Sequence, residues 1–284
     1  MKNFLSLVFV TLASAIRETG FSYLGGINMS SKLKKNGKVS KQHTYGLYLA
    51  PHKLSGYNTC PNSTPECRLG CLYASGHTAI EMWSGLNHIQ NSRIGKTKLF
   101  YENQEYFMRW LVTEIDAKRK TAEKKGFGFS VRLNCTSDID WANVKLYGQN
   151  VFEIFPDITF YDYTKNPKKF LNKPANYHLT LSYTGRNWNE CTKVLAQGFN
   201  VAMIFNVKNE SEIPAMYKGY EVINGDITDY RIDDAKGIIV GLKWKRIADK
   251  QAENQVLNSC FVVKPDASTS TIDTRNVQTL KVAL

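Results

Sequence analysis

Short apolar runs rich in β-branched and aromatic residues recur along the chain, and polar or helical stretches separate them. Runs of this length and composition are typical of buried strands. Connections long enough for helices lie between several of the runs, which favours β/α units and a parallel sheet. We therefore expect a single-domain α/β fold, an incomplete TIM-like β/α barrel with about seven mainly parallel strands. The predicted strands occupy residues 44–50, 127–133, 158–161, 177–181, 200–205, 220–223 and 237–244.

Helical periodicity is clearest before the second predicted strand. Residues 88–101 predict one helix, and Asn103 is a suitable N-cap for a second. In the second helix Phe107, Leu111 and Ile115 recur at four-residue steps, and Gly126 is a suitable C-terminal stop. Shorter helices are expected at residues 151–155 and 188–197.

The two ends of the chain have a different character. The apolar segment 4–16 is too short to span a bilayer and predicts an N-terminal helix that packs on the protein or on a partner. The Lys-rich segment 30–42 lacks apolar periodicity and is expected to be a loop or arm. We accordingly divide the chain into an N-terminal helix and basic arm at 1–43, an α/β domain at 44–263, and a loosely ordered tail at 264–284.

Net charge and cysteine usage indicate which cell compartment and which class of binding partner suit the protein. The 37 Lys and Arg residues outnumber the 25 Asp and Glu residues, which gives a net charge of +12 and favours nucleic acid or nucleotide partners. Basic residues gather at 32–41, 118–125, 165–173 and 243–250, and each group is equally compatible with a solvated face. Three of the six cysteines, Cys135, Cys191 and Cys260, are scattered without the pattern of a disulfide framework. This usage indicates a reducing cytoplasm.

Three of the six cysteines, Cys60, Cys67 and Cys71, fall within twelve residues. Sulfur ligands at this spacing, with Pro and Gly between them, can converge on one metal ion or iron–sulfur cluster. Two alternatives stay open, a disulfide with a spare thiol, and thiols packed as small hydrophobic groups. His52 and His77 flank the loop, and either could complete a zinc site, although a lone histidine is more often a surface or packing residue.

Polar residues follow the predicted strands at their carboxyl ends, where parallel α/β folds bind ligands. The candidate catalytic residues are Asp138, Asp162, Lys165 and Asp226. Asp138 and Asp226 also stand in good turn sequences, so a structural role is an open alternative for both. The candidate cofactor-binding residues are Arg132, Asn134, Thr136, Ser137, Ser182, Thr184, Arg186 and Asn206.

Several familiar sites are missing from the sequence. It contains neither a Walker phosphate loop nor the glycine fingerprint of dinucleotide-binding folds. The paired zinc motifs of nucleobase deaminases are missing as well.

Leu-Tyr-Leu-Ala-Pro at 47–51, Phe-Tyr-Asp-Tyr-Thr-Lys at 160–165 and several further motifs stand along the chain. Together they resemble phage proteins named after gene product 88 of a mycobacteriophage. The resemblance covers roughly residues 44–263 and includes Arg-Leu-Asn-Cys-Thr-Ser-Asp at 132–138, where Cys135 replaces an expected glycine. It implies a phage or prophage origin, a host-cell cytoplasm as the location and a host or phage protein as a possible partner, and it implies no settled activity. The other stretches that carry it are 55–61, 67–76, 96–100, 177–180, 224–226 and 240–243.

The cysteine loop also resembles the cluster-binding loop of radical SAM enzymes. That resemblance implies a 4Fe-4S cluster on Cys60, Cys67 and Cys71, with one iron left for S-adenosylmethionine. The loop departs from the pattern because three residues separate its last two cysteines, and Gly70 stands where an aromatic residue is usual.

Three functions follow as hypotheses. The first is a radical SAM-like enzyme that modifies a nucleic acid or a nucleotide-derived substrate. The second is a zinc-containing, transglycosylase-like barrel enzyme that acts on nucleobases or glycosidic bonds through Asp138 or Asp162. The third is a metal-stapled protein that binds nucleic acid without catalysis.

Overall fold

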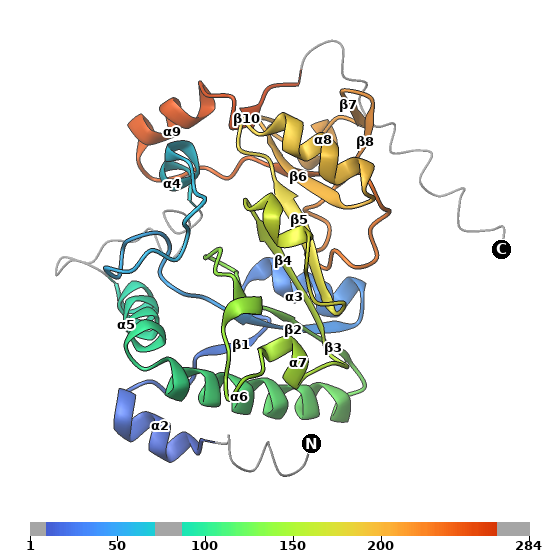
Figure 1. Ribbon diagram of the computed structural model, residues 1–284. Helices are drawn as coiled ribbons and strands as arrows, with labels where there is room; N and C mark the ends of the chain where they lie inside the picture. Colours follow the sequence, from blue (N-terminus) through green and yellow to red (C-terminus); the bar gives the residue numbers. More distant parts are fainter. Residues whose placement is uncertain (1–9, 72–86, 266–284) are drawn as a thin grey trace, which may run out of the picture.

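A mostly parallel sheet forms the centre of the protein (Figure 1). The computed structural model describes residues 10–71 and 87–265, and this part of the chain contains ten strands. Each of the seven expected strands is present. They are β2 (Gln42–Leu47), β3 (Gly128–Arg132), β4 (Thr159–Thr164), β5 (Tyr177–Ser182), β6 (Asn200–Phe205), β8 (Tyr220–Asn224) and β9 (Ile239–Lys243). Three short strands were not expected, namely β1 (Gly25–Ile27), β7 (Met216–Tyr217) and β10 (Val262–Val263).

The strands are arranged in the order β1-β2-β3-β4-β5-β6-β9-β8-β7, and β10 pairs with β6. Among the described strands, the pairs β1–β2 and β7–β8 are antiparallel, and the other strand pairs are parallel. The expected α/β class and mainly parallel sheet are therefore confirmed. Over the described residues no strand pairing joins the β1 edge to the β7 edge, so the sheet is open.

The two long helices lie where their sequence signals place them. Helix α5 (His88–Glu102) begins with a capping box between Asn87 and Gln90. Helix α6 (Gln104–Lys124) begins at Asn103, whose side chain accepts the N–H of Tyr106. The shorter helices are α2 (Leu12–Thr19), α4 (Pro65–Leu69), α7 (Val151–Ile154), α8 (Trp188–Ala196) and α9 (Lys250–Leu257). Three short 3-10 helices are η3 (Trp141–Asn143), η4 (Pro167–Phe170) and η5 (Glu210–Glu212).

The expectation of a loop at residues 30–42 was wrong. Helix α3 (Ser31–Val39) occupies most of that segment, and the side chain of Ser30 caps it by accepting the N–H of Leu33. The helix carries a polar anchor, Asn36, which is completely buried. Its amide donates to Thr44 Oγ1 in β2 and accepts the backbone N–H of Asp229. Apolar periodicity could not reveal this helix because part of its buried face is an amide.

The described residues cover only part of the predicted N-terminal helix and C-terminal tail. Helix α2 begins at Leu12, with Thr11 as its N-cap, so it lies later than the apolar segment 4–16 suggested. Residues 1–9 and 266–284, which include most of the expected tail, lie outside the described residues. Among the described residues, none of the helices combines the length and apolar character needed to cross a bilayer.

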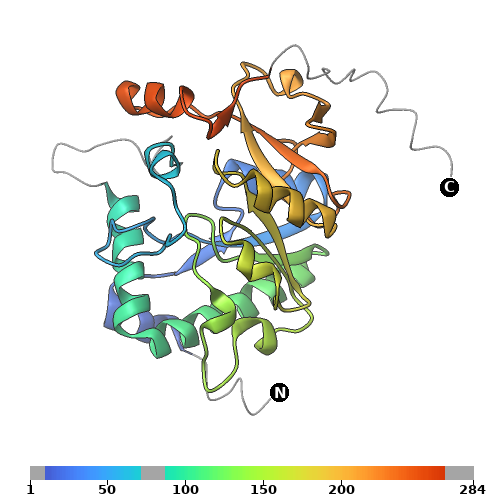
Figure 2. The same cartoon turned by 45° about the horizontal axis from the view of Figure 1, so that its top comes forward.

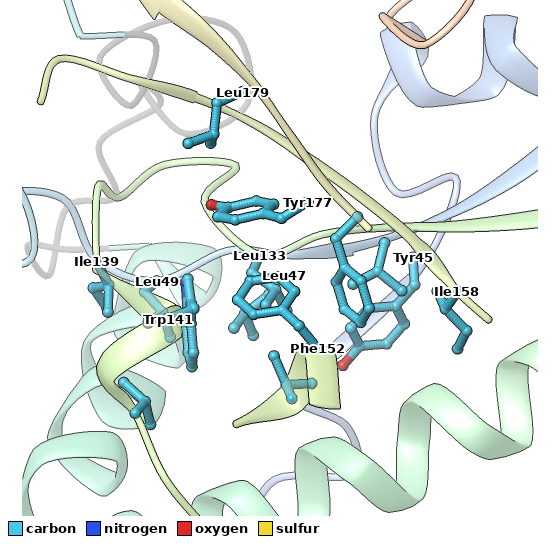
Figure 3. Packing of buried hydrophobic residues seen from close by; sticks show 14 of the residues in the cluster. Tyr45, Leu47, Leu49, Leu133, Ile139, Trp141, Phe152, Ile158, Tyr177 and Leu179 are labelled. Carbon is cyan, nitrogen blue, oxygen red and sulfur yellow. The ribbon is translucent and has the colours of Figure 1, made fainter. Parts of the chain in front are cut away.

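The core lies between the sheet and helix α6, which runs across β1, β2 and β3. Figure 3 shows side chains from β2 and β5 converging with Leu133, Trp141 and Phe152. Burial of each large apolar side chain of this kind stabilises the fold by about 1.5–3 kcal/mol. Glu114 of α6 is also buried there. Its carboxyl group accepts hydrogen bonds from the backbone of Leu24 and from Tyr45 Oη, which offset the cost of burying it.

A second, smaller core supports the cysteine loop. Helix α9 packs against helix α4, and both views show the two side by side (Figures 1 and 2). Cys67 of α4 packs against this cluster from one side. The chain that follows β9 therefore forms the surface on which the cysteine helix rests. The cluster consists of Trp244, Ile247, Ala252, Val256, Phe261 and Val262.

Candidate functional site

A cavity of about 770 Å³ opens at the carboxyl ends of β3, β4, β5, β6 and β9. The first turns of α3, the start of α5 and Gly70 of the cysteine loop complete its walls. This is the position at which parallel α/β folds bind ligands. Its volume is that of a site for one small molecule or one unit of a polymer.

The cavity walls are strongly cationic. Among the described residues that line the cavity, two are acidic, Asp226 and Asp229. Each unmatched cation raises the positive potential inside the cavity, where low-dielectric walls strengthen it. An anionic ligand would therefore be stabilised there. The lining cations are Lys32, Lys34, Arg93, Arg132, Lys165, Lys243 and Lys245.

The two carboxylates are held by neighbouring cations. Arg132 Nη1 donates to Asp229 Oδ2 at 2.7 Å, and Lys32 Nζ lies 3.5 Å from one oxygen of each carboxylate. Burial by itself would raise the pKa of Asp229, but the charges of Arg132 and Lys32 outweigh burial and lower the pKa. Asp226 also accepts the backbone N–H of Lys243 at 2.7 Å. Both side chains are therefore anchored in the cavity wall by hydrogen bonds and ion pairs.

The cysteine loop follows β2 and is tied to the strand ends by hydrogen bonds. Thr59 Oγ1 donates to the carbonyl of Ala50, and the N–H of Asp138 donates to the carbonyl of Thr59. The thiol of Cys60 accepts the N–H of His52 at 3.4 Å, and its sulfur lies 3.8 Å from the carbonyl oxygen of Thr136. Burial raises the pKa of this thiol. The first cysteine is thus fixed against the end of β3.

The other two cysteines lie on or beside helix α4. Thr64 caps this helix by accepting the N–H of Cys67 at 3.2 Å. A Cβ atom at Gly70 would lie 3.0 Å from the ring of Trp244, so a side chain there would require the ring to shift. Cys71 ends the described part of the loop, and His77 lies outside the described residues.

Lys165 and Asp138 connect the loop to β4. The N–H of Lys165 donates to Asp138 Oδ2 at 3.0 Å, and Lys169 Nζ donates to Asp138 Oδ1 at 2.7 Å. Burial by itself would lower the pKa of Lys165, but the neighbouring Cys67 and Asp138 groups outweigh burial and raise the pKa. Lys165 therefore places a cation between the cysteine loop and the cavity.

The three loop cysteines are free thiols, so the alternative of a disulfide among them is not found in this structure. Across residues 10–71 and 87–265, no three His, Cys, Asp or Glu side chains are grouped closely enough to hold a metal ion. His52 contacts Cys60 through its backbone N–H. The donor atoms have the right chemistry for zinc or iron–sulfur binding, but their described arrangement is not that of a formed metal site.

A family model described as Gene product 88 matches residues 27–258, which is more than half of the chain. The chain belongs to the Gene product 88 family. The match confirms the resemblance to these phage proteins that the sequence motifs indicated. No curated protein and no solved structure matches the chain.

Part of the predicted site faces the cavity in this Gene product 88 protein. Five of the predicted residues line the cavity, and they come from four strand ends. Two of the five, Lys165 and Asp226, were candidate catalytic residues. Cys135 lines the cavity too, and burial raises the pKa of its thiol to about 12. The predicted residues that line the cavity are Arg132, Thr136, Lys165, Ser182 and Asp226.

Other predicted residues belong to the framework behind the cavity. Asp162 is buried and accepts the N–H of Asn134 at 2.8 Å and the hydroxyl of Tyr177 at 3.0 Å. Asn134 Oδ1 in turn accepts hydrogen bonds from the Ser137 hydroxyl and the Trp141 indole. Thr184, Arg186 and Asn206 are also placed away from the lining, and Arg186 pairs with Glu66 at 2.7 Å.

Sequence reasoning overlooked most of the cationic wall. Lys32 and Lys34 come from the segment that was expected to be a loop, and Lys243 and Lys245 come from the last basic group. The available signal was the clustering of basic residues at 32–41 and 243–250. That signal cannot separate a solvated face from a cavity wall, because both carry the same residue types.

Proposed function

We propose that this Gene product 88 protein is a phage metalloenzyme that modifies a nucleic acid or a nucleotide-derived substrate. The observation that supports it is one cavity in which excess cations meet the cysteine loop. Gly70, between Cys67 and Cys71, lines the same cavity as Lys165 and Asp226. A substrate that enters for its charge would thus lie next to the cysteine loop and beside a carboxylate.

The fold that we propose for this function is an incomplete TIM-like β/α barrel. Five parallel strands, from β2 to β6, stand side by side in chain order, and the cavity opens at their carboxyl ends. Asn36 of α3 bonds to Thr44 in β2 and to Thr228 in the segment after β8. Helix α3 thus lies between the first and the last parallel strand of the sheet, which supports a curved rather than a flat arrangement.

The leading proposal for the metal is a 4Fe-4S cluster held by Cys60, Cys67 and Cys71. Soft thiolates are the usual ligands of such clusters, and two of the three thiols already lie near Lys165, whose charge would offset part of theirs. Binding would require the three thiolates to come closer together than they are in the described conformation. When bound, the cluster would supply the electron for reductive cleavage of S-adenosylmethionine.

The residues of this chain would then bind and orient the substrate. The cationic walls hold its negative charge, and Asp138 keeps Lys165 at the edge of the cysteine loop by accepting its N–H. Asp226 presents a carboxylate that can accept a hydrogen bond or a proton from the substrate. The host-cell cytoplasm is the compartment that suits free thiols and a nucleotide substrate.

The zinc-containing, transglycosylase-like enzyme is the second candidate, and one observation modifies it. Asp138 and Asp162, the acids first considered for that reaction, are hydrogen-bonded within the framework. Of the two carboxylates that line the cavity, Asp229 is paired with Arg132 at 2.7 Å, so Asp226 is the carboxylate that would act on a glycosidic bond there. A non-catalytic nucleic-acid-binding protein would use the same cations without Asp226.

Metal content separates these candidates. We would purify the protein without oxygen, reconstitute it with iron and sulfide, and measure iron, zinc, sulfide and the visible spectrum. The triple variant Cys60→Ser, Cys67→Ser, Cys71→Ser is compared with Cys260→Ser, an exposed thiol outside the loop. About four irons per chain in the wild type and Cys260→Ser, lost in the triple variant, would support the cluster. One zinc supports the second candidate, and a wild type that holds neither metal refutes the metalloenzyme.

A further inference from the structure

The N-terminal end of helix α3 faces the cavity. Met29, Ser30, Ser31, Lys32 and Lys34 all line it. The first N–H groups of any helix lack partners within the helix, and the helix dipole makes this end attractive to anions. No acidic residue occupies the first turn of this nine-residue helix to offset that effect. A phosphate group placed there would meet backbone donors as well as lysines.

The end of β9 supplies further cations to the same wall. Lys243 and Lys245 line the cavity beside Lys32. Although part of Lys245 is exposed, desolvation of its amine and then the charge of Lys32 lower its pKa. Within the described residues, neither Lys34 nor Lys245 forms an ion pair with a carboxylate. The wall therefore holds more positive charge than Asp226 and Asp229 can balance, and a bound anion would relieve the repulsion.

Aromatic side chains form another part of the cavity. Tyr183, Trp244 and Phe261 line it; Tyr183 is half-buried, and Trp244 and Phe261 belong to the smaller core. Aromatic rings at a cavity wall are the groups on which nucleobases stack. Trp244 is held in place because its indole Nε1 donates to Glu253 Oε1 at 3.2 Å. The same ring contacts Gly70, next to Cys71. A base on this side would lie near the cysteine loop.

We propose that the wall formed by the first turn of α3 and the end of β9 binds the phosphate of a single nucleotide unit. In this arrangement the base points toward Trp244 and the cysteine loop. The cavity accepts one nucleotide, either free or as an unpaired unit of a single strand, because a volume of about 770 Å³ cannot enclose a duplex. The inference names the substrate of the proposed enzyme and rests on that proposal for the reaction, whereas the binding is independent of the metal.

Binding can be measured by calorimetry with four probes: nucleoside monophosphates, the matching nucleosides, inorganic phosphate and a short single-stranded oligonucleotide. The test variant is Lys34→Met with Lys245→Met, and the matched control is Lys193→Met on the exposed side of α8. We expect the wild type and the control to bind a monophosphate or the oligonucleotide at least about tenfold more tightly than the nucleoside. The double variant should lose about tenfold or more of that affinity, and affinity should fall with added salt.

Either of two kinds of result would overturn the phosphate site, and a third would overturn its assignment to a nucleotide. One is equal affinity for nucleoside and monophosphate, or none for any probe; the other is unchanged affinity in a folded double variant with a wild-type circular dichroism spectrum. Phosphate that binds as tightly as every nucleotide would refute the nucleotide assignment. Preference between the free monophosphate and the oligonucleotide identifies the source of the unit, and either preference supports the site.

The triple cysteine variant separates this inference from the proposed function. Retained nucleotide affinity in that variant would support a phosphate site that is independent of the metal. A wild type without metal that still binds nucleotide would refute the metalloenzyme and leave the phosphate site standing. A metal-loaded wild type without nucleotide affinity would refute the phosphate site and leave the metalloenzyme standing.

Discussion

The buried carboxyl group of Asp162 should make the stability of this protein depend on pH in a defined direction. The residue is 2% exposed, and its carboxyl oxygen Oδ1 lies 3.8 Å from Arg132 Nε. Burial raises its pKa from 3.8 to about 7, although Arg132 and the N–H of Asn134 act in the opposite direction. Between these two pKa values the folded protein retains a proton that the unfolded chain has released. Stability contributed by this group is therefore lost as the pH rises.

The magnitude follows from the two pKa values. A difference between 3.8 and about 7, at about 1.4 kcal/mol per pH unit, corresponds to a loss of about 4 kcal/mol between about pH 4 and about pH 8. Asp162→Asn removes the titrating group and keeps an oxygen that can accept the N–H of Asn134. The difference in free energy of unfolding between the variant and the wild type should therefore shift by about 4 kcal/mol in favour of the variant over this pH range. Any cost of the amide itself is the same at every pH and leaves this shift unchanged.

Urea denaturation of the wild type, Asp162→Asn and Asp157→Asn at several pH values measures this difference directly. Asp157 is exposed, so its substitution should leave the stability difference from the wild type nearly constant with pH. All other titrating groups are shared and cancel in the comparison. Parallel stability curves for Asp162→Asn and the wild type would show that Asp162 is charged in the folded protein, and the reasoning from burial would be refuted.

Three further substitutions test contacts that organise the fold around the cavity. Asn36→Ala removes an amide with four hydrogen bonds and should lower the free energy of unfolding, measured in urea, by about 2–4 kcal/mol. The control Asn189→Ala, at an exposed position, should change it little. Equal effects of the two substitutions would contradict the role of α3. Gly70→Ala forces the ring of Trp244 to move and should cost about 1–3 kcal/mol with a shift in tryptophan fluorescence, and an unshifted spectrum would contradict the contact. Glu114→Ala leaves buried donors without an acceptor and should cost about 3 kcal/mol or more by thermal denaturation, and a cost under about 1 kcal/mol would contradict that account.

Much of the local structure was predictable because its signals are local. The cap at Asn103, the four-residue steps of the following helix and the seven apolar runs all depend on neighbours within a few residues. The three overlooked strands have two or three residues each, too few for a periodic pattern. Helix α3 was missed because Asn36 occupies a core position that apolar patterning assigns to a hydrophobic residue.

The sequence by itself determined the fold class, the positions of most elements, the cysteine loop and the excess of basic residues. Only the tertiary structure decided which polar residues face the cavity. Asp162 and Asp226 both follow from strand positions, yet one is held in the framework and the other lines the cavity. Lys32 and Lys245 are distant in the chain and meet only in the folded protein. The physical reason is that secondary structure depends on near neighbours, whereas a site depends on which surfaces the packing brings together.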